Sequence, residues 1–173
     1  FDDGSSVYFN DQRNFGTVKI VRGRHHLLKK LSSLGPDMLA QDVSDDVFRE
    51  KVCKKLQWPV TKVIMNQSII AGVGNYVKAD ALWLSKLSPH RTIESLTSAE
   101  LSLLNNSIKK ILRESYQSGG ATIRTYENFD GSLGQYTQRF LVYNQKEDPD
   151  GNKVIKEKTP DGRTTHWVPK VQK

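Results

Sequence analysis

Apolar residues recur every three or four positions through the middle of the chain, which is the spacing of one helix face. A capping serine, three apolar residues and a terminating proline outline a first helix: Ser44, Phe48, Val52, Leu56 and Pro59. A second amphipathic helix is predicted over residues 73–87, and a third follows a cap at Thr97 or Ser98 and stops at a pair of glycines. The pattern therefore predicts a helical block over residues 42–118.

Both ends of the chain alternate between apolar and polar residues, as strands do. Val7 and Phe9, and again Val18 and Ile20, predict two strands near the N-terminus. Two strands are seldom stable alone in water, so we interpret them as the end of a sheet whose other strands lie upstream. Near the C-terminus, "YTQRFLVYNQ", "VIKEK" and "TTHWV", with the turn clusters "EDPDGNK" and "TPDGR", predict a small antiparallel set. The predicted fold class is therefore α+β.

Composition and charge narrow the class of protein. The chain has 173 residues and a formal net charge of +7, with a pI near 9.5, which favours a polyanionic partner or a solvated basic surface. No run approaches the roughly 18 apolar residues of a membrane span, and no secretory leader is visible. Cys53 is the only cysteine, which excludes a disulfide framework and a four-cysteine metal site. An intracellular protein is expected.

The stretch "IAGVGNYV" carries the clearest candidate chemistry. Gly72 and Gly74 allow a tight turn between two helices, and Asn75 falls in the first turn of the second helix. Backbone N–H groups at such a helix start, together with an asparagine side chain, can bind a phosphate. The alternative is a plain connector whose glycines only end a helix. A Walker loop is excluded, because no Lys-Ser or Lys-Thr follows the glycines.

Several longer stretches resemble one family. "QSIIAGVGNYVKADALWLSKLSPHR" is similar to the helix-two-turn-helix signature of the Fpg/Nei DNA glycosylases, bifunctional enzymes that excise oxidised bases. "YFNDQRNFG" resembles the end of that family's N-terminal β-sandwich, and "LGPDML" resembles its entry into the helical domain. "GGATIRTYENFDGSLGQYTQRFLVYNQ" resembles the run from the last helix into the finger. These matches occur in the family's order and span nearly the whole chain.

The resemblance implies a domain organisation. Residues 1–22 would be the C-terminal strands of the β-sandwich catalytic domain, and residues 23–41 a linker. Residues 42–118 would form the helix-two-turn-helix DNA-binding domain, and residues 119–173 a β-hairpin finger. The predicted architecture is thus an α+β fragment with terminal strands of a β-sandwich, a helical domain and a zincless β-hairpin finger.

The closing "GRTTHWVPKVQ" departs from most of the family. It keeps Arg163 and the threonines of the finger, but Val168 and Val171 occupy the positions of two zinc-binding cysteines. The resemblance is to the zincless branch, so packing and hydrogen bonds are expected to hold the hairpin, with no metal and no cofactor. His166 is expected on a strand, facing solvent or DNA. One histidine without partners is a poor metal site.

The resemblance also assigns phosphate contacts. Asn75 and Arg163 match residues that grip DNA phosphates on either side of the lesion, and Gly74 lets the backbone approach closely. A guanidinium suits bidentate phosphate binding. Tyr143 matches a tyrosine that approaches a backbone phosphate, although an aromatic packed beneath the finger is an equal alternative. Lys78 is expected to add non-specific attraction.

Two residues match those that the family inserts into the duplex. Arg13 would fill the gap left by the extruded base, and Phe15 would wedge the opposite side. Inserted side chains compensate the few kcal/mol of stacking that base flipping costs. The alternative is a strand-end ion pair of Asp11 with Arg13, and Phe15 in a core.

Catalytic residues are not expected in this chain. The family attacks C1′ of the sugar with the secondary amine of an N-terminal proline, and an adjacent glutamate handles protons. This chain begins with Phe1, and its first proline is Pro36. Neither Pro36 nor Glu50 can take those roles, because the proline nitrogen must be a free terminus. The nucleophile is expected on an upstream segment of roughly 110 residues.

The sequence therefore predicts the C-terminal part of a base excision repair DNA glycosylase and AP lyase. It is expected to act on oxidised bases, with a lean toward oxidised pyrimidines. The expected partner is damaged double-stranded or single-stranded DNA, bound by a monomer without zinc and away from membranes. The alternatives are a non-catalytic DNA-binding protein that keeps the helical block and finger, and a ribosomal or other RNA-binding protein. The loop "NDQRNFG" argues against both.

Overall fold

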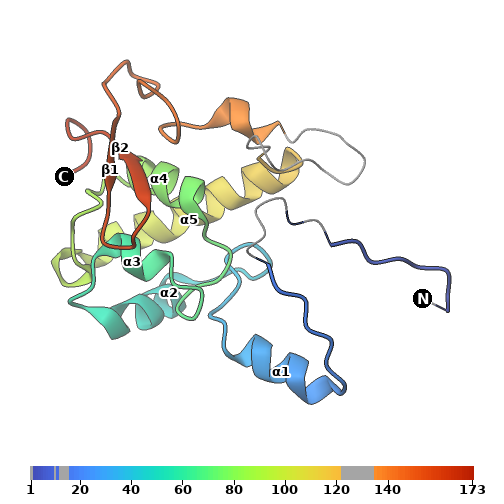
Figure 1. The fold of residues 1–173 in the computed structure, drawn as a ribbon. Helices are drawn as coiled ribbons and strands as arrows, with labels where there is room; N and C mark the ends of the chain where they lie inside the picture. The colour runs from blue at the N-terminus through green and yellow to red at the C-terminus, as the bar shows by residue number, and fades with distance from the viewer. Residues whose placement is uncertain (1, 10, 12–15, 122–134) are drawn as a thin grey trace.

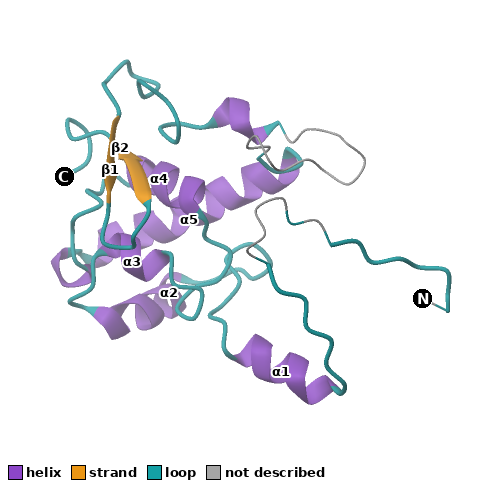
Figure 2. Cartoon of the chain, viewed as in Figure 1, coloured by secondary structure: helices purple, strands orange, loops and turns teal. Residues whose placement is uncertain are grey.

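The computed structural model describes residues 2–9, 11, 16–121 and 135–173 of the chain. Its elements in chain order are α1 (Arg24–Ser32), α2 (Asp45–Val52), the 3-10 turn η1 (Cys53–Lys55), α3 (Val60–Ile64), α4 (Asn75–Leu84), the 3-10 turn η2 (Ile93–Ser95), α5 (Ser98–Gln117), the 3-10 turn η3 (Tyr136–Arg139), β1 (Ile155–Lys158) and β2 (Thr164–Trp167). Helices α2 to α5 form one block, and the β1–β2 hairpin lies against α4 (Figures 1 and 2). The α+β class is confirmed.

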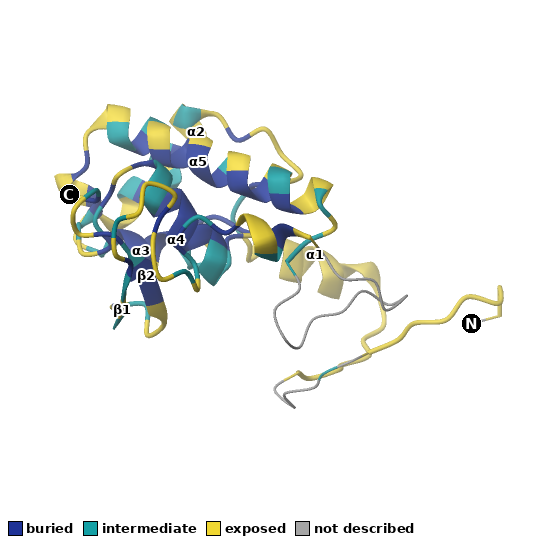
Figure 3. Ribbon diagram, turned by 90° about the horizontal axis from the view of Figure 1, so that it is seen from above, coloured by how far each residue is buried: buried dark blue, intermediate teal, exposed yellow. Residues whose placement is uncertain are grey.

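Helix α5 is the longest of the described helices, and its ends are fixed locally. The Thr97 hydroxyl accepts a hydrogen bond from the Glu100 N–H, and the Glu100 carboxylate accepts one from the Thr97 N–H at 2.7 Å, which is a complete capping box. One face of the helix is buried: Leu101, Leu104, Ile108, Ile111 and Leu112. This face packs against α4 and α2, and Figure 3 shows buried residues concentrated along it. The apolar period of the sequence therefore becomes the core of the block.

Helix α2 is tied to α5 by polar groups as well as by packing. Ser44 caps α2 by accepting a hydrogen bond from the Val47 N–H, as the sequence predicts. Phe48 and Val52 are fully buried in the shared core. The buried Asn105 amide donates to the Val43 carbonyl and, at 2.7 Å, to the Asp45 carboxylate. These bonds fix where α2 starts relative to α5.

A short extended segment crosses the turn between α3 and α4. The Gly35 N–H donates to the Gln67 carbonyl at 2.8 Å, and the Ala71 N–H donates to the Pro36 carbonyl at 2.8 Å. A Cβ atom at position 35 would overlap the Ile69 carbonyl, so only glycine fits this crossing. The segment that resembles the family's entry into the helical domain thus supports the turn that carries the candidate site.

The hairpin is anchored to the helical block by a buried carboxylate. Asp80 of α4 accepts hydrogen bonds from the backbone N–H groups of Leu141, Val142 and Tyr143 at 3.0 to 3.1 Å. Burial raises the pKa of the Asp80 carboxyl, and the three N–H bonds oppose that rise. The predicted strand over "YTQRFLVYNQ" is therefore wrong. The segment forms η3 and a turn, because its N–H groups bind Asp80 instead of a neighbouring strand.

The predicted antiparallel pair after this turn is confirmed. β1 pairs with β2 in the register Ile155↔Trp167 to Lys158↔Thr164, and residues 159–163 form the hairpin tip. β2 packs against α4. The tip is thereby brought beside the N-terminal end of α4, more than 80 residues earlier in the chain, as the bond between Lys78 and Asp161 shows.

The N-terminal region differs from the sequence prediction. The described residues before position 23 form no strand, and Val7 and Ile20 are 79% and 93% exposed. The described part of the chain supplies no neighbouring strand to bind their backbone groups, which is the condition that strands need. Residues 23–41, expected as a linker, include helix α1, in which no residue is buried.

Candidate nucleic-acid interface

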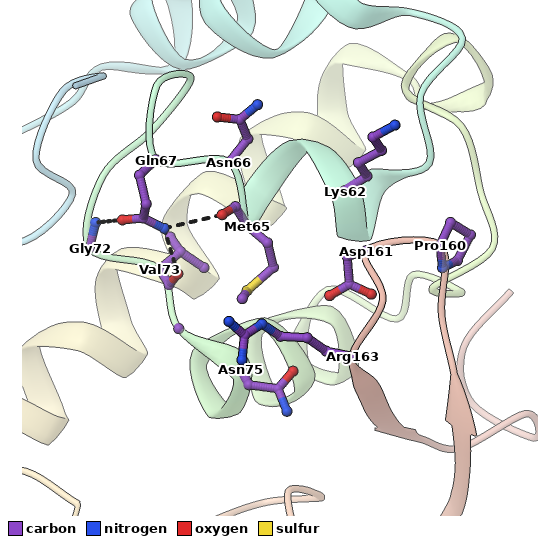
Figure 4. Close-up of a pocket in the computed structure, with 11 residues that line it drawn as sticks. Lys62, Met65, Asn66, Gln67, Gly72, Val73, Asn75, Pro160, Asp161 and Arg163 are labelled. Atoms are coloured by element: carbon purple, nitrogen blue, oxygen red, sulfur yellow. Dashed lines mark hydrogen bonds between the residues drawn. The ribbon is translucent and has the colours of Figure 1, made fainter. Parts of the chain in front are cut away.

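A groove of about 670 Å³ lies between α3, the glycine-rich turn and the hairpin tip (Figure 4). It is lined by Lys62, Met65, Asn66, Gln67, Gly72, Val73, Gly74, Asn75, Pro160, Asp161 and Arg163. These residues come from segments about 90 positions apart, which Asp80 and the β1–β2 pairing bring together. Three of the predicted site residues, Gly74, Asn75 and Arg163, therefore lie in one groove.

Gln67 fixes the glycine-rich turn. Its side-chain oxygen accepts a hydrogen bond from the Gly72 N–H at 2.9 Å, and its amide donates to the carbonyls of Met65 and Val73 at 3.2 and 3.0 Å (Figure 4). Gly72 has a φ of +93°, a conformation that favours glycine. The turn is thus set by side-chain bonds before α4 begins. Sequence reasoning did not single out Gln67, although it is the first residue of the stretch that resembles the helix-two-turn-helix signature.

Neither the backbone conformation of Gly74 nor its neighbours within the chain require a glycine at this position. Its φ is −104°, which any residue adopts, and a Cβ atom there would meet nothing within 4 Å. Gly74 caps α4 without a side-chain bond, so the first-turn N–H groups, which have no partner within the helix, receive no cap. These N–H groups and the helix dipole favour an anion at this place. An absent Cβ leaves room for one.

Asn75 joins α4 to the hairpin. Its side-chain nitrogen donates to the Thr164 carbonyl at 3.0 Å, and its side-chain oxygen is buried without a partner among the described residues. The predicted phosphate contact through this side chain would require exchange of the bond to Thr164. In the structure, Asn75 holds the tip of the hairpin over the start of α4.

Arg163 is the predicted residue best placed to meet an anion. It is exposed, and its guanidinium forms no hydrogen bond or ion pair within the described part of the chain. Its carbonyl is fixed, because it accepts from the Thr159 N–H at 3.0 Å and from the Thr159 hydroxyl at 3.1 Å. Figure 4 shows the side chain extending across the groove toward Met65, above Asn75. The backbone is therefore held while the charge stays available.

Lys78 does not take the role that the sequence suggested. Its ammonium lies 2.6 Å from the Asp161 carboxylate, and the two side chains are 0% and 3% exposed. Burial lowers the pKa of Lys78, which Asp161 opposes; burial would raise the pKa of Asp161, but hydrogen bonds from Lys78 and Thr159 lower it. A buried and paired ammonium is not available to a phosphate. The pair instead fixes the tip against α4. A local sequence pattern could not predict this role, because the two residues are 83 positions apart.

Tyr143 and His166 pack together beneath the hairpin. Tyr143 is half-buried, with its ring 5.2 Å from that of Phe140 and 5.0 Å from that of His166. Of the two alternatives for Tyr143, the structure favours the packed aromatic. His166 is 4% exposed, which contradicts the expected solvent-facing position. Burial lowers the pKa of His166 to about 4, and the charges of Lys156 and Lys78 add to that effect.

The base of the hairpin is closed by apolar packing, as predicted. We call Ala79, Val142, Val154 and Val168 the base cluster; all four are buried, and Trp83, Tyr143 and Val171 pack against them. The Val168 N–H donates to the side-chain oxygen of Gln172, whose amide donates to the Leu87 carbonyl. Within the described residues, no three His, Cys, Asp or Glu side chains are placed to hold a metal ion.

The remaining predicted residues fall elsewhere. Arg13 and Phe15 lie outside the described residues, so their predicted insertion into the duplex stays a prediction. No helix in the described part of the chain is long and apolar enough to span a bilayer.

Comparison with known proteins bears on this arrangement. Residues 34–127 match the formamidopyrimidine-DNA glycosylase H2TH domain. Residues 130–173 match the formamidopyrimidine-DNA glycosylase C-terminal domain. The chain belongs to the formamidopyrimidine-DNA glycosylase family. The matched H2TH domain includes α3, the glycine-rich turn and α4, which together line one side of the groove.

Individual relatives agree with this assignment. The formamidopyrimidine-DNA glycosylase of Bacillus licheniformis is 31% identical over 100% of this chain and 64% of its own length; that of Listeria monocytogenes serotype 4b is 33% identical, with the same coverage. The crystal structure of the MutM (Fpg) protein from Thermus thermophilus is similar with a TM-score of 0.84, at 30% identity over 95% of this chain and 64% of that one. The complex of Lactococcus lactis Fpg with DNA containing an abasic site is similar with a TM-score of 0.76, at 29% identity over 87% and 55%. The chain spans 61–64% of the length of the curated relatives it matches.

Proposed function

We propose that this chain is the DNA-binding part of a base excision repair DNA glycosylase and AP lyase, and that its groove binds a DNA backbone phosphate. The observation that carries the proposal is the position of Arg163. It faces the uncapped start of α4 across a floor that Gly74 leaves open, and it has no anionic partner in the described part of the chain. Structures of the Lactococcus lactis relative contain DNA with a Fapy-dG lesion or an abasic site, which supports DNA as the ligand.

The charges of the groove agree with an anionic ligand. Asp161 is the acidic residue among the lining side chains, and its charge is balanced by the buried Lys78. Lys62 and Arg163 then leave the groove positive. A guanidinium can bind two phosphate oxygens at once, while the N–H groups of the α4 start bind the same group from the other side. Asn75 contributes by holding the tip in place.

The chemical step belongs to the complete protein. We propose that a proline amine at its mature N-terminus attacks C1′ of the damaged nucleotide, the base leaves, and the resulting Schiff base undergoes elimination that cuts the strand. The described residues bind and orient the DNA for that step. Oxidised pyrimidines remain the proposed lesions, while the name of the relatives points to formamidopyrimidines, so both belong in an activity test. We propose a monomer that acts wherever the cell keeps its DNA.

Arg163→Ala tests the proposal in the complete protein. Its affinity for a duplex with an abasic-site analogue should fall by about 1–3 kcal/mol, the scale of a hydrogen bond to a charged group. The slope of log K against log salt should decrease by about 0.9, as for the loss of one phosphate contact. Arg113→Ala removes the same charge from the exposed surface of α5 and is the matched control. Unchanged binding by Arg163→Ala would show that the groove is not a phosphate site.

Borohydride trapping separates the enzyme from a non-catalytic DNA-binding protein. The complete protein should be trapped covalently on abasic-site DNA, because borohydride reduces a Schiff base to a stable amine. The 173-residue chain alone should bind such DNA without being trapped. A complete protein that binds damaged DNA tightly but is never trapped is the alternative of a non-catalytic binding protein.

A further inference from the structure

Lys62 is a second cation in the groove that the sequence did not single out. It stands on α3 and is exposed, whereas Arg163 comes from the hairpin (Figure 4). Its ammonium lies 4.1 Å from the centre of the Trp58 ring, and the ammonium of Lys55 lies 4.9 Å from the centre of the same ring. Lys62 lines the groove, and Lys55 does not. Two lysines thus share one aromatic ring, and one of them, Lys62, belongs to the rim of the groove.

Neither lysine is neutralised. Among the residues that the structure describes, no carboxylate lies within 4 Å of the ammonium of Lys55 or Lys62, whereas neighbouring Lys54 pairs with Glu50 at 3.0 Å. The carboxylate that lines the groove, Asp161, is already paired with Lys78. An electron-rich ring attracts a cation without cancelling its charge. Lys62 is therefore held in place but still available to an anion.

The surroundings restrict where Lys62 can point. Thr61 and Val63 on either side are fully buried, so residue 62 must project from the block. The backbone of Trp58 is itself fixed on both sides. Its backbone N–H donates to the Lys55 carbonyl at 2.9 Å, and its carbonyl accepts from the Ile93 N–H at 3.1 Å. A side chain ordered before binding loses less freedom when the ligand arrives. The Trp58 ring thus restricts the positions that the Lys62 side chain can take at the rim of the groove.

We propose that Lys62 binds a second backbone phosphate of the DNA whose first phosphate lies at Arg163, and that Trp58 is its positioning residue. This inference rests on the proposed function of the groove. DNA presents phosphates at regular spacing, so a strand held at one point of the groove carries further anions past its rim. The compact ammonium of a lysine binds such a charge without the fixed geometry of a guanidinium.

Binding of the complete protein to abasic-site duplex DNA over a series of salt concentrations tests this inference. Lys62→Ala should weaken binding by about threefold to tenfold near physiological salt and lower the slope of log K against log salt by about 0.9. Lys62→Arg should restore most of both. Lys55→Ala is the matched control, since it removes the same charge from the same ring outside the groove. It should leave the slope within error of the parent.

The role of Trp58 has a separate signature. Trp58→Leu should weaken binding by about twofold to fivefold while the salt slope stays at the parental value, because Lys62 keeps its charge and loses only its support. Thermal unfolding of each variant shows whether the fold is intact, and Trp58→Phe, which keeps an aromatic face, should recover part of the loss. A Trp58→Leu variant that is folded and binds as the parent does overturns the positioning role.

The outcomes separate this inference from the proposed function. If Arg163→Ala weakens binding while Lys62→Ala matches Lys55→Ala in affinity and slope, the second phosphate contact is overturned and the groove stands. If neither Arg163→Ala nor Lys62→Ala changes binding, the proposed function of the groove itself fails. A lower affinity of Lys62→Ala with an unchanged slope also overturns the phosphate contact, because the loss of an ionic contact must change the slope.

Discussion

The two ends of the β1–β2 hairpin are held against α4 by opposite means. The tip is held by polar groups, namely the buried Lys78–Asp161 ion pair and the bond from Asn75 to the Thr164 carbonyl. The base is held by the apolar base cluster, in which Val168 is fully buried. The two ends of the hairpin are held differently because they have different tasks. At the tip, Arg163 lines the groove that is proposed to bind a phosphate, while the described residues of the base cluster pack against one another.

The ion pair at the polar end adds little net stability. Removing two charges from water costs several kcal/mol per ion, which a single well-made ion pair only balances. A well-packed apolar contact would be at least as stable, so the value of the ion pair is proposed to lie in the position that it gives the tip. The ion pair and the Thr159–Asp161 bond at 2.5 Å permit one position, and Arg163 follows two residues later. The apolar end is filled by packed side chains, among them the fully buried Val168.

Asp161→Asn should give the largest effect on stability. The substitution leaves the Lys78 ammonium buried without a counter-charge, and breaking such a pair costs about 3–5 kcal/mol. Urea unfolding followed by tryptophan fluorescence measures the free energy of unfolding. The double variant Lys78→Met with Asp161→Asn should recover most of the loss, because no unpaired charge remains. An Asp161→Asn protein as stable as the parent would mean that the tip is not held by this pair.

The same contrast explains what the sequence could foretell. Ser44 and Thr97 cap helices through bonds that span three residues, so the start of α2 and of α5 could be predicted from local pattern. The Lys78–Asp161 pair spans 83 residues, and nothing local distinguishes that aspartate from an ordinary "PDG" turn. The glycine-rich turn and Arg163 were found because their motifs are contiguous.

The incorrect predictions have the same cause. The aromatic-rich stretch before the hairpin has the residue pattern of a strand. Its backbone N–H groups at residues 141–143 instead donate to the Asp80 carboxylate, which precedes Leu141 by 61 residues. His166 was expected on a strand facing solvent or DNA, but β2 buries Thr165 and His166 in succession, because the hairpin lies between α4 and the Tyr143 turn. The two N-terminal strands need partner strands that the described residues do not supply.

Mild acid should weaken the region between the two ends of the hairpin. His166 has a pKa of about 4 in the folded protein against about 6.5 in an unfolded chain. Between pH 6.5 and about 4, His166 is therefore mostly protonated in the unfolded chain and mostly neutral in the folded protein. The contribution of neutral His166 is complete above pH 6.5 and is lost as the pH falls toward 4, by about 3 kcal/mol in total.

Comparison with His166→Phe isolates this titration. Phenylalanine keeps a ring beside Tyr143 and removes two ring nitrogens that have no hydrogen-bond partner among the described residues. The free energy of unfolding of this variant should change little between pH 6.5 and 4.5, where the parent loses stability. The lowered pKa of Asp161 acts below that window. Equal losses in parent and variant would assign the acid sensitivity to other groups.

Val168→Ala should give a smaller effect than Asp161→Asn. It removes two buried methyl groups, worth about 0.8 kcal/mol each, and leaves part of a cavity, so a loss of about 2 kcal/mol is expected. Val171 is only half-buried at the edge of the base cluster, and Val171→Ala should cost under about 1 kcal/mol. DNA affinity of both variants, measured well below their melting temperatures, should match the parent, because Arg163 and its supports are untouched. If folded Val168→Ala bound DNA clearly more weakly than the parent, the base cluster would also position Arg163, and the proposed difference between the two ends of the hairpin would be wrong.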